Sequence, residues 1–183
     1  EAARLKEDLS GGTPVEREPV YEQTACQSGL DDIGSTYVEI DYTKQHLWYY
    51  KEGKLIVETD IVSGNIAKKN GSPDGLFKIV YKQKDATLVG ENYASKVKYF
   101  MPFAYNVGIH DASWRSSFGG DIYKTSGSHG CINVPPSIAK KLYKTLEIGT
   151  PVIAFYRDPV TLITENCKIS NAYSYKDPDK EEN

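Results

Sequence analysis

The sequence predicts a mainly β fold, a β-sandwich or partly open barrel, with one or two helices packed against it. Short segments that alternate polar and apolar residues recur between clusters of glycine, proline, asparagine and aspartate, which is typical of strands joined by turns. The aromatic residues are mostly tyrosine, with 14 Tyr against 5 Phe and 2 Trp. Aromatic side chains pack well on a pleated sheet, so this composition also favours β structure.

The strand candidates share alternating or β-branched apolar residues, bounded by turn residues. They are residues 37–42, 46–50, 55–62, 76–81, 97–103, 106–110, 151–156 and 160–164. The first three include a hairpin, because Lys51-Glu52-Gly53-Lys54 provides a glycine-containing turn between residues 46–50 and 55–62.

One segment of the central region has the apolar spacing of an amphipathic helix, at residues 137–148. Prolines stand at its start and Gly149 at its end, as helix termini prefer. Residues 2–9 are expected to form the last turns of another helix, which Gly11, Gly12 and Pro14 would end.

Three regions follow from these patterns. Residues 1–35 are interpreted as a linker or the remnant of an upstream domain, 36–167 as the folded domain, and 168–183 as a polar, solvated tail. Because the chain begins at Glu1, we expect a processed or recombinant fragment, with any signal peptide or membrane anchor upstream.

Composition excludes several classes of protein. The net charge of −3 and a pI of about 5.7 give no basic surface for nucleic acid. No apolar run approaches the roughly 20 residues needed to cross a bilayer. With 3 widely spaced cysteines in 183 residues, the chain is not a small disulfide scaffold, and at least one thiol is left over.

The densest concentration of reactive residues is Ser126-Gly127-Ser128-His129-Gly130-Cys131-Ile132-Asn133. Cys131 is a candidate nucleophile, because it lies in a glycine-containing loop just before the predicted helix. The N-terminus of that helix is expected to lower the thiol pKa from about 8.5. Backbone N–H groups around Cys131 could form an oxyanion hole.

Each of the three histidines is a possible base for this thiol. His110 ends a strand-like segment, where a rigid scaffold commonly places reactive groups. His129 is close to Cys131 in sequence, although its side chain need not face the thiol. His46 lies between strand positions and is interpreted as structural.

Other interpretations of these residues remain open. Cys131 could be a buried small hydrophobe, as we interpret Cys26 and Cys167. His110, His129 and Cys131 could bind zinc, although no fourth ligand with characteristic spacing is present. Ser128 is a weaker nucleophile candidate than the thiol.

Taken together, the segments around these residues resemble the L,D-transpeptidase catalytic domain family. The pattern of His110, then 17 residues, then Ser128-His129-Gly130-Cys131-Ile132-Asn133 is similar to the family's upstream histidine and Ser/Thr-His-Gly-Cys-hydrophobic-Asn motif. Ser72 stands where a Thr-Pro-x-Gly-x-Phe turn of the family usually has threonine. The further matching segments are residues 37–41, 45–48, 71–79, 99–103 and 111–114, so the likeness covers about Thr36 to Tyr156.

This resemblance implies an extracytoplasmic, cell-surface or cell-wall enzyme that acts on peptidoglycan. It would take a tetrapeptide stem as donor, release its terminal D-Ala, and join the donor's third residue to an acceptor amine as a 3–3 crosslink. Carbapenems would acylate it. No cofactor, metal or nucleic acid is implied, and the full-length protein would be membrane-anchored or wall-associated. Asparagine after Cys131-Ile132, where many Gram-negative members carry arginine, points to the Gram-positive type.

The resemblance also implies a role for each motif residue. Cys131 would be the nucleophile and His110 its general base, oriented by the backbone carbonyl of Asp111; His129 and Gly130 would shape the loop. The residues expected to contact substrate or support the cleft are Trp114, Met101, Tyr105, Ser128 and Asn133.

Three alternatives to transfer remain: an L,D-carboxypeptidase-type cysteine hydrolase, an inert wall-binding module, and the zinc protein considered above. The two other cysteines, Cys26 and Cys167, flank the domain. In a two-sheet fold the first and last strands can be neighbours, so a Cys26–Cys167 disulfide and two unpaired thiols are both compatible with the sequence.

Overall fold

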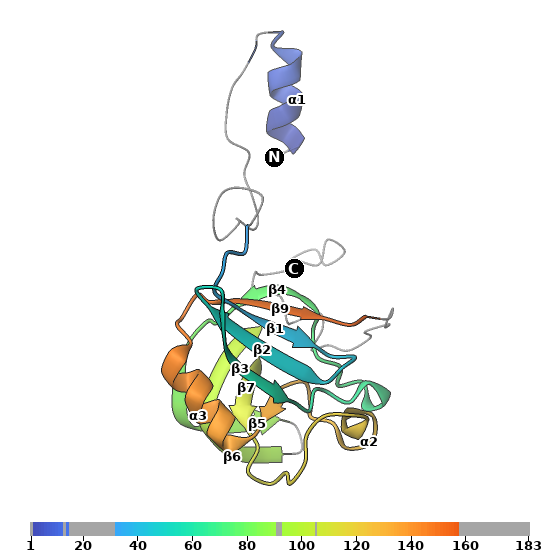
Figure 1. Ribbon diagram of the computed structural model, residues 1–183. Coiled ribbons are helices and arrows are strands. Elements are labelled where there is room, and N and C mark those ends of the chain that lie inside the picture. The colour runs from blue at the N-terminus through green and yellow to red at the C-terminus, as the bar shows by residue number, and fades with distance from the viewer. Residues whose placement is uncertain (1, 13, 15–31, 91–92, 105, 158–183) are drawn as a thin grey trace.

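The computed structural model describes residues 2–12, 14, 32–90, 93–104 and 106–157. Two β-sheets form the folded domain (Figure 1), which confirms the predicted mainly β class. Within the described residues, no helix is long and apolar enough to cross a membrane.

The first sheet has five strands in the order β3-β2-β1-β9-β4. Their bounds are β1 Tyr37–Asp41, β2 His46–Lys51, β3 Lys54–Asp60, β4 Gly75–Lys78 and β9 Pro151–Phe155. β1 and β9 run parallel while the other pairs are antiparallel, so the first and last described strands are neighbours, as the sequence suggested.

The second sheet has four strands in the order β5-β6-β7-β8. They are β5 Gln83–Gly90, β6 Tyr93–Ala104, β7 Val107–Asp111 and β8 Ile132–Val134. β7 and β8 pair in parallel; β7 carries His110, and β8 begins directly after Cys131.

Helices occupy the remaining regular segments. They are α1 Ala2–Ser10, the 3-10 helix η1 Ile66–Lys68, α2 Ile122–Ser126 and α3 Pro136–Thr145. α3 packs against β7, β6 and β3, and its buried Ala139 and Leu142 join the main hydrophobic core. Both predicted helices are present.

The β2–β3 hairpin forms where the glycine-containing turn predicted it. Glu52 and Gly53 have φ values of 51° and 74°, the left-handed conformation that two-residue hairpin turns of type I′ require. Glycine adopts this conformation at no steric cost, which explains its position here.

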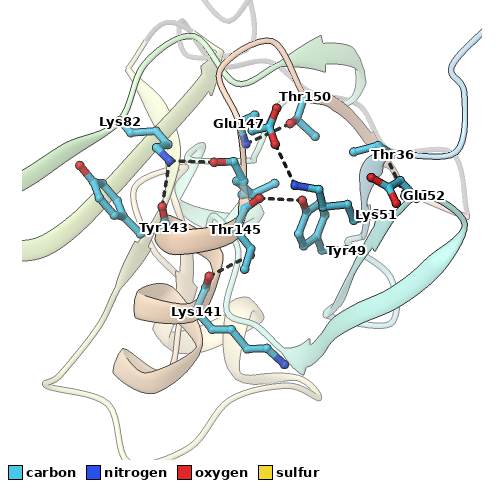
Figure 2. Close-up of polar contacts among 11 residues, drawn as sticks. Thr36, Tyr49, Lys51, Glu52, Lys82, Lys141, Tyr143, Thr145, Glu147 and Thr150 are labelled. Atoms are coloured by element: carbon cyan, nitrogen blue, oxygen red, sulfur yellow. Dashed lines mark hydrogen bonds and ion pairs between the residues drawn. The ribbon is translucent and has the colours of Figure 1, made fainter.

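Helix α3 ends three residues earlier than the predicted 137–148. Leu146 is extended, and its backbone N–H donates to the Leu142 carbonyl at 2.8 Å. The Lys82 ammonium donates to the carbonyls of Tyr143 and Leu146 at 2.9 and 2.7 Å, and the buried Tyr49 hydroxyl donates to the Thr145 carbonyl at 2.9 Å (Figure 2). These donors satisfy carbonyls that a helix C-terminus leaves unpaired.

Two strands, β5 and β8, were not predicted from the sequence. β5 begins with three exposed polar residues and exposes the apolar Val89, so its apolar residues do not stand out as the alternating pattern of a strand. β8 has only three residues, all buried, and is too short for a periodic pattern. The predicted strand at 160–164 and the tail at 168–183 lie outside the described residues, and the boundaries of the domain at 36 and 167 stay predictions.

Candidate active site

Strand β7 places His110 in the interior of the domain. The side chain is 3% exposed, and its register partners are Phe100 on β6 and Asn133 on β8. The Nδ1–H group donates to the backbone carbonyl of Asp111 at 2.8 Å. Burial lowers the pKa of His110 more strongly than this hydrogen bond raises it, so the imidazole is neutral at neutral pH.

The loop before Cys131 is held by its own hydrogen bonds. Ser128 Oγ accepts from the Gly130 N–H at 3.0 Å and donates to the Cys131 carbonyl at 2.5 Å. Gly130 has a φ of 125°, a conformation that residues with a Cβ rarely adopt. Glycine adopts this conformation without strain, which lets the Ser128–Cys131 bond close.

Neighbouring segments anchor the same loop to the rest of the fold. The backbone of Ser128 bonds to Ser63 and Asn65 at 2.9 and 3.0 Å. The Ser72 hydroxyl, which is fully buried, accepts from the Gly64 N–H at 2.9 Å and donates to the Gly130 carbonyl at 2.6 Å. The Ser72-Pro73 turn is therefore hydrogen-bonded directly to the loop that carries Cys131.

Cys131 is partly buried against a small apolar cluster that includes Phe100, Leu88 and Val97. Its thiol donates to the Asn106 carbonyl at 3.4 Å. Burial raises the pKa of the Cys131 thiol from its ordinary value of 9.0 to about 11, while a hydrogen bond from the Gly108 backbone N–H opposes that rise. The resting thiol is therefore protonated at neutral pH.

This pKa contradicts the expectation that a helix N-terminus lowers it. Cys131 leads directly into β8, and α3 begins only at Pro136. The helix dipole acts within the first turn of a helix, so a strand between the thiol and the helix removes its effect. Desolvation by the apolar cluster dominates instead.

The thiol and the imidazole open into one cleft of about 180 Å³. Its lining includes Cys131, His110, Trp114, Arg115, Tyr93 and His129. A nucleophile, a neutral base and an aromatic wall therefore face the same cavity, an arrangement suited to acyl transfer through a thioester.

Comparisons with known proteins agree with this geometry. A family model described as the L,D-transpeptidase catalytic domain matches residues 35–153. The chain belongs to this family. No curated protein matches it.

Solved L,D-transpeptidases have the same fold. A crystal structure of the Enterococcus faecium L,D-transpeptidase, in a cysteine-to-serine variant, is 45% identical, with 85% of this chain and 63% of that chain covered and a TM-score of 0.68. The NMR structure of the E. faecium catalytic domain is 51% identical, with 66% and 96% covered and a TM-score of 0.60. The same domain acylated by ertapenem is 50% identical, with 66% and 97% covered and a TM-score of 0.60.

The present chain spans about 63% of the length of the first of these E. faecium structures. The likeness to the isolated catalytic domain, in contrast, extends over 96% of that domain. The part of an L,D-transpeptidase that carries the chemistry is therefore represented nearly whole.

Several of the expected L,D-transpeptidase residues lie around the cleft. The His129 ring stacks on Tyr93 with 4.3 Å between centroids. Trp114 is half exposed, and its ring lies 6.0 Å from that of His110. Ser128 and Asn133 also line the cleft.

Met101 does not line the cleft, and its expected contact with substrate is wrong. The side chain is fully buried and belongs to the main core, whereas the preceding Phe100 packs in the small cluster against Cys131. Successive side chains on a strand point to opposite faces, which separates these two neighbours. Tyr105 lies outside the described residues, as do Cys26 and Cys167.

The zinc alternative finds no ligand set in the part of the chain that the structure describes. There, no three His, Cys, Asp or Glu side chains come together as a metal site would need. His46 lies elsewhere, with Nδ1 2.8 Å from Asp60 Oδ1 and its ring against Trp48 at 4.4 Å.

Sequence reasoning missed Arg115. Its Nε–H donates to Asn133 Oδ1 at 2.7 Å, and Asn133 Nδ2 lies 3.1 Å from His110 Nε2. Arg115 directly follows the motif residue Trp114, but adjacency alone gives no reason to connect it with the base. That connection arises only when β7 and β8 pair in parallel.

Proposed function

We propose that this chain is a peptidoglycan L,D-transpeptidase that uses Cys131 as its nucleophile and forms 3–3 crosslinks. The observation that carries the proposal is that Cys131 and His110 line one cleft, with Nδ1 of His110 held by the Asp111 carbonyl. The ertapenem-acylated E. faecium domain and the avibactam carbamoyl enzyme support extending acylation by β-lactams and related inhibitors to this chain.

The acylation step begins when the neutral Cys131 thiol transfers its proton to the neutral His110 imidazole. His110 holds its proton on Nδ1 through the Asp111 carbonyl, so Nε2 carries the lone pair. At rest the Asn133 NH₂ group lies 3.1 Å from Nε2, and the lone pair accepts the Cys131 proton when this contact opens. The sulfur then attacks the carbonyl between the donor's third residue and D-Ala. When the tetrahedral intermediate collapses, the C–N bond breaks, His110 returns the proton to the leaving amine, and D-Ala departs.

In the second step the acceptor amine is the nucleophile and the Cys131 sulfur is the leaving group. The acceptor amine attacks the thioester, His110 takes the proton that the amine loses, and the Cys131 sulfur leaves and is reprotonated. One new amide bond replaces the one that was broken, so no oxidant or cofactor is needed.

The oxyanion in both steps needs a fixed donor near the thiol. The Gly130 N–H is engaged by Ser128 Oγ, and we assign the backbone N–H of Cys131 as an oxyanion donor. Such a donor contributes about 3–4 kcal/mol to transition-state stabilisation. The hydrogen bonds that hold the Ser128–Cys131 loop fix this group in advance.

The decisive measurement is a mass experiment. Incubation with ertapenem is expected to add one inhibitor mass to the protein, and the Cys131→Ala variant should show no adduct while keeping the fold. A wild-type protein without an adduct, or full crosslinking by Cys131→Ala, would contradict the assignment. An inert wall-binding module would also give no adduct.

Hydrolysis is the competing outcome, because water can replace the acceptor amine at the same thioester. Incubation with disaccharide tetrapeptides separates the two: a crosslinked dimer with release of D-Ala is expected for transfer. A tripeptide product alone would make the protein an L,D-carboxypeptidase. We further propose that the enzyme works outside the cytoplasm, at the cell surface or wall, in a full-length protein that is membrane-anchored or wall-associated, because its substrate would be peptidoglycan.

A further inference from the structure

Arg115, Asn133 and Asp111 form a chain of hydrogen bonds with the base, His110. Arg115 Nε–H donates to Asn133 Oδ1 at 2.7 Å, Asn133 Nδ2 lies 3.1 Å from His110 Nε2, and His110 Nδ1 lies 2.8 Å from the Asp111 carbonyl. His110 and Asn133 are 3% and 2% exposed, so water does not substitute for these partners.

The fold fixes each member of this chain. His110 and Asn133 are register partners on the parallel strands β7 and β8 and therefore share a sheet face. The Asn133 backbone makes two hydrogen bonds with Val62, each 3.0 Å long. Arg115 is turned back toward Asn133 by the hydrogen bond from its N–H to the Ala112 carbonyl at 3.1 Å.

The chemistry of Arg115 decides the direction of every bond in the chain. A guanidinium has only donors, so the Asn133 atom that faces it must be the carbonyl oxygen. The Asn133 NH₂ group then faces His110 and donates to Nε2, which must carry a lone pair. On the other side of the ring, the Asp111 carbonyl accepts from Nδ1–H.

We propose that Arg115 is a positioning residue that acts through the Asn133 amide to hold His110 as the neutral tautomer, with its proton on Nδ1 and its lone pair on Nε2. This inference rests on the proposed function, because it assigns Arg115 a role in preparing the base for the Cys131 proton.

The same chain opposes the charged form of the base. An imidazolium carries a proton on Nε2, which would meet the Asn133 NH₂ group, and Arg115 prevents the amide from rotating to present its oxygen. The positive charge of Arg115 also lowers the pKa of His110, after burial as the larger cause. A proton accepted from Cys131 is therefore readily passed on to the leaving amine.

Other ionisable groups near His110 do not set the tautomer. The Asp111 carboxylate accepts from the Tyr99 backbone N–H at 2.7 Å, and it raises the pKa of His110. Cys131, Tyr93 and His129 line the same cleft as His110. Phe100 and Trp114 contribute only rings, 6.5 and 6.0 Å from the imidazole.

The test is a pH titration of the histidine ring nitrogens by NMR in the ¹⁵N-labelled full chain, compared with Arg115→Gln. Wild-type His110 is expected to show Nδ1–H and an unprotonated Nε2. Glutamine can accept as well as donate, so the Asn133 amide gains the freedom to rotate. Arg115→Gln should therefore populate Nε2–H and move the His110 midpoint upward by about one pH unit, a tenfold change in proton affinity.

Two matched variants separate positioning from a general structural effect. Arg115→Lys keeps a donor-only group and should restore most of the wild-type tautomer and midpoint. Arg157→Gln removes a guanidinium that pairs with Asp41 instead, and should leave the His110 titration unchanged. A titration of Arg115→Gln identical to wild type, or an equal shift in Arg115→Lys, would overturn the proposal.

Asn133→Asp gives a second test that does not depend on the stability of the Arg115 variants. The carboxylate is nearly isosteric, still pairs with Arg115, and can accept from Nε2–H. It should raise the His110 midpoint further than Arg115→Gln and slow ertapenem acylation at neutral pH by at least about tenfold. An unchanged midpoint would count against the proposal. Because the titration needs no turnover, its result is independent of whether ertapenem acylates Cys131.

Discussion

At the residue scale, the catalytic proposal depends on His110 being a base that is neutral before the reaction. His110→Ala is expected to slow ertapenem acylation of Cys131 at neutral pH by about 10²–10⁴-fold, the usual contribution of a general base. The measurement is the rate of adduct formation by mass spectrometry. His46→Ala is the matched control, because His46 pairs with Asp60 outside the cleft. Equal rates in the His110 variant and wild type would remove His110 from the base role.

The pKa of Cys131 gives a second prediction at this scale. Because burial raises the pKa of this thiol to about 11, only about one molecule in 10⁴ carries the thiolate at pH 7. Alkylation of Cys131 by iodoacetamide should therefore keep rising with pH until about pH 11. Peptide mapping distinguishes Cys131 from Cys26 and Cys167. A rate that is already at its plateau below pH 8 would show a resting thiolate–imidazolium pair instead.

Enzymatic acylation should follow a different pH profile from alkylation. His110 must be unprotonated to accept the thiol proton, and burial lowers its pKa from 6.5. The acid limb of ertapenem acylation is therefore expected below pH 6.5, with little change across neutral pH. This profile would show that the base, and not the thiolate population, limits the reaction.

At the element scale, the loop that carries Cys131 depends on the turn that carries Ser72. Ser72→Ala would leave the Gly130 carbonyl and the Gly64 N–H unpaired in the buried interior. Such groups cost about 1–3 kcal/mol, so the Tm should fall by several degrees and ertapenem acylation should slow. Ser72→Thr is the matched variant, because it keeps the hydroxyl and restores the residue usual in the family motif. Loss of stability in Ser72→Thr equal to that in Ser72→Ala would contradict this explanation.

The elements also show what could be predicted from the sequence and why the rest could not. The β2–β3 hairpin and α3 were predictable because their patterns are local: a glycine turn in one case and an apolar face between prolines and glycine in the other. β5 and β8 were not, because pairing with β6 and β7 defines them: β5 has polar residues over its first half and an exposed Val89, and β8 has only three residues.

The same distinction applies to the site. The family resemblance of the motif predicted that Cys131 and His110 act together. Both residues line one cleft. The thiol pKa was predicted in the wrong direction because it depends on a cluster assembled from β5 and β6, which no local pattern reveals. Arg115 was missed because its link to His110 runs through Asn133 and depends on the pairing of β7 with β8, which no local pattern reveals.

At the scale of the whole molecule, the cleft depends on a segment that leads out of the first sheet. Val62 bridges to Asn133 and Gly64 bridges to Ser128, so the segment after β3 of the first sheet holds both the Cys131 loop and β8. The cleft itself is lined by the second sheet and its loops, so the first sheet supports the site through this segment without lining it. The reactivity of Cys131 should therefore be lost together with the global fold.

Val152→Ala tests this coupling from the far side of the first sheet. Val152 is fully buried on β9, between its partners Val38 on β1 and Phe77 on β4, and it does not line the cleft. Removing its methyl groups should destabilise the fold by roughly 1–3 kcal/mol. Urea unfolding followed by Trp48 and Trp114 fluorescence and residual ertapenem acylation should give one shared midpoint in wild type, shifted equally in the variant. If the fluorescence midpoint falls while the acylation midpoint stays at the wild-type value, the site is stable without the first sheet and the coupling is absent.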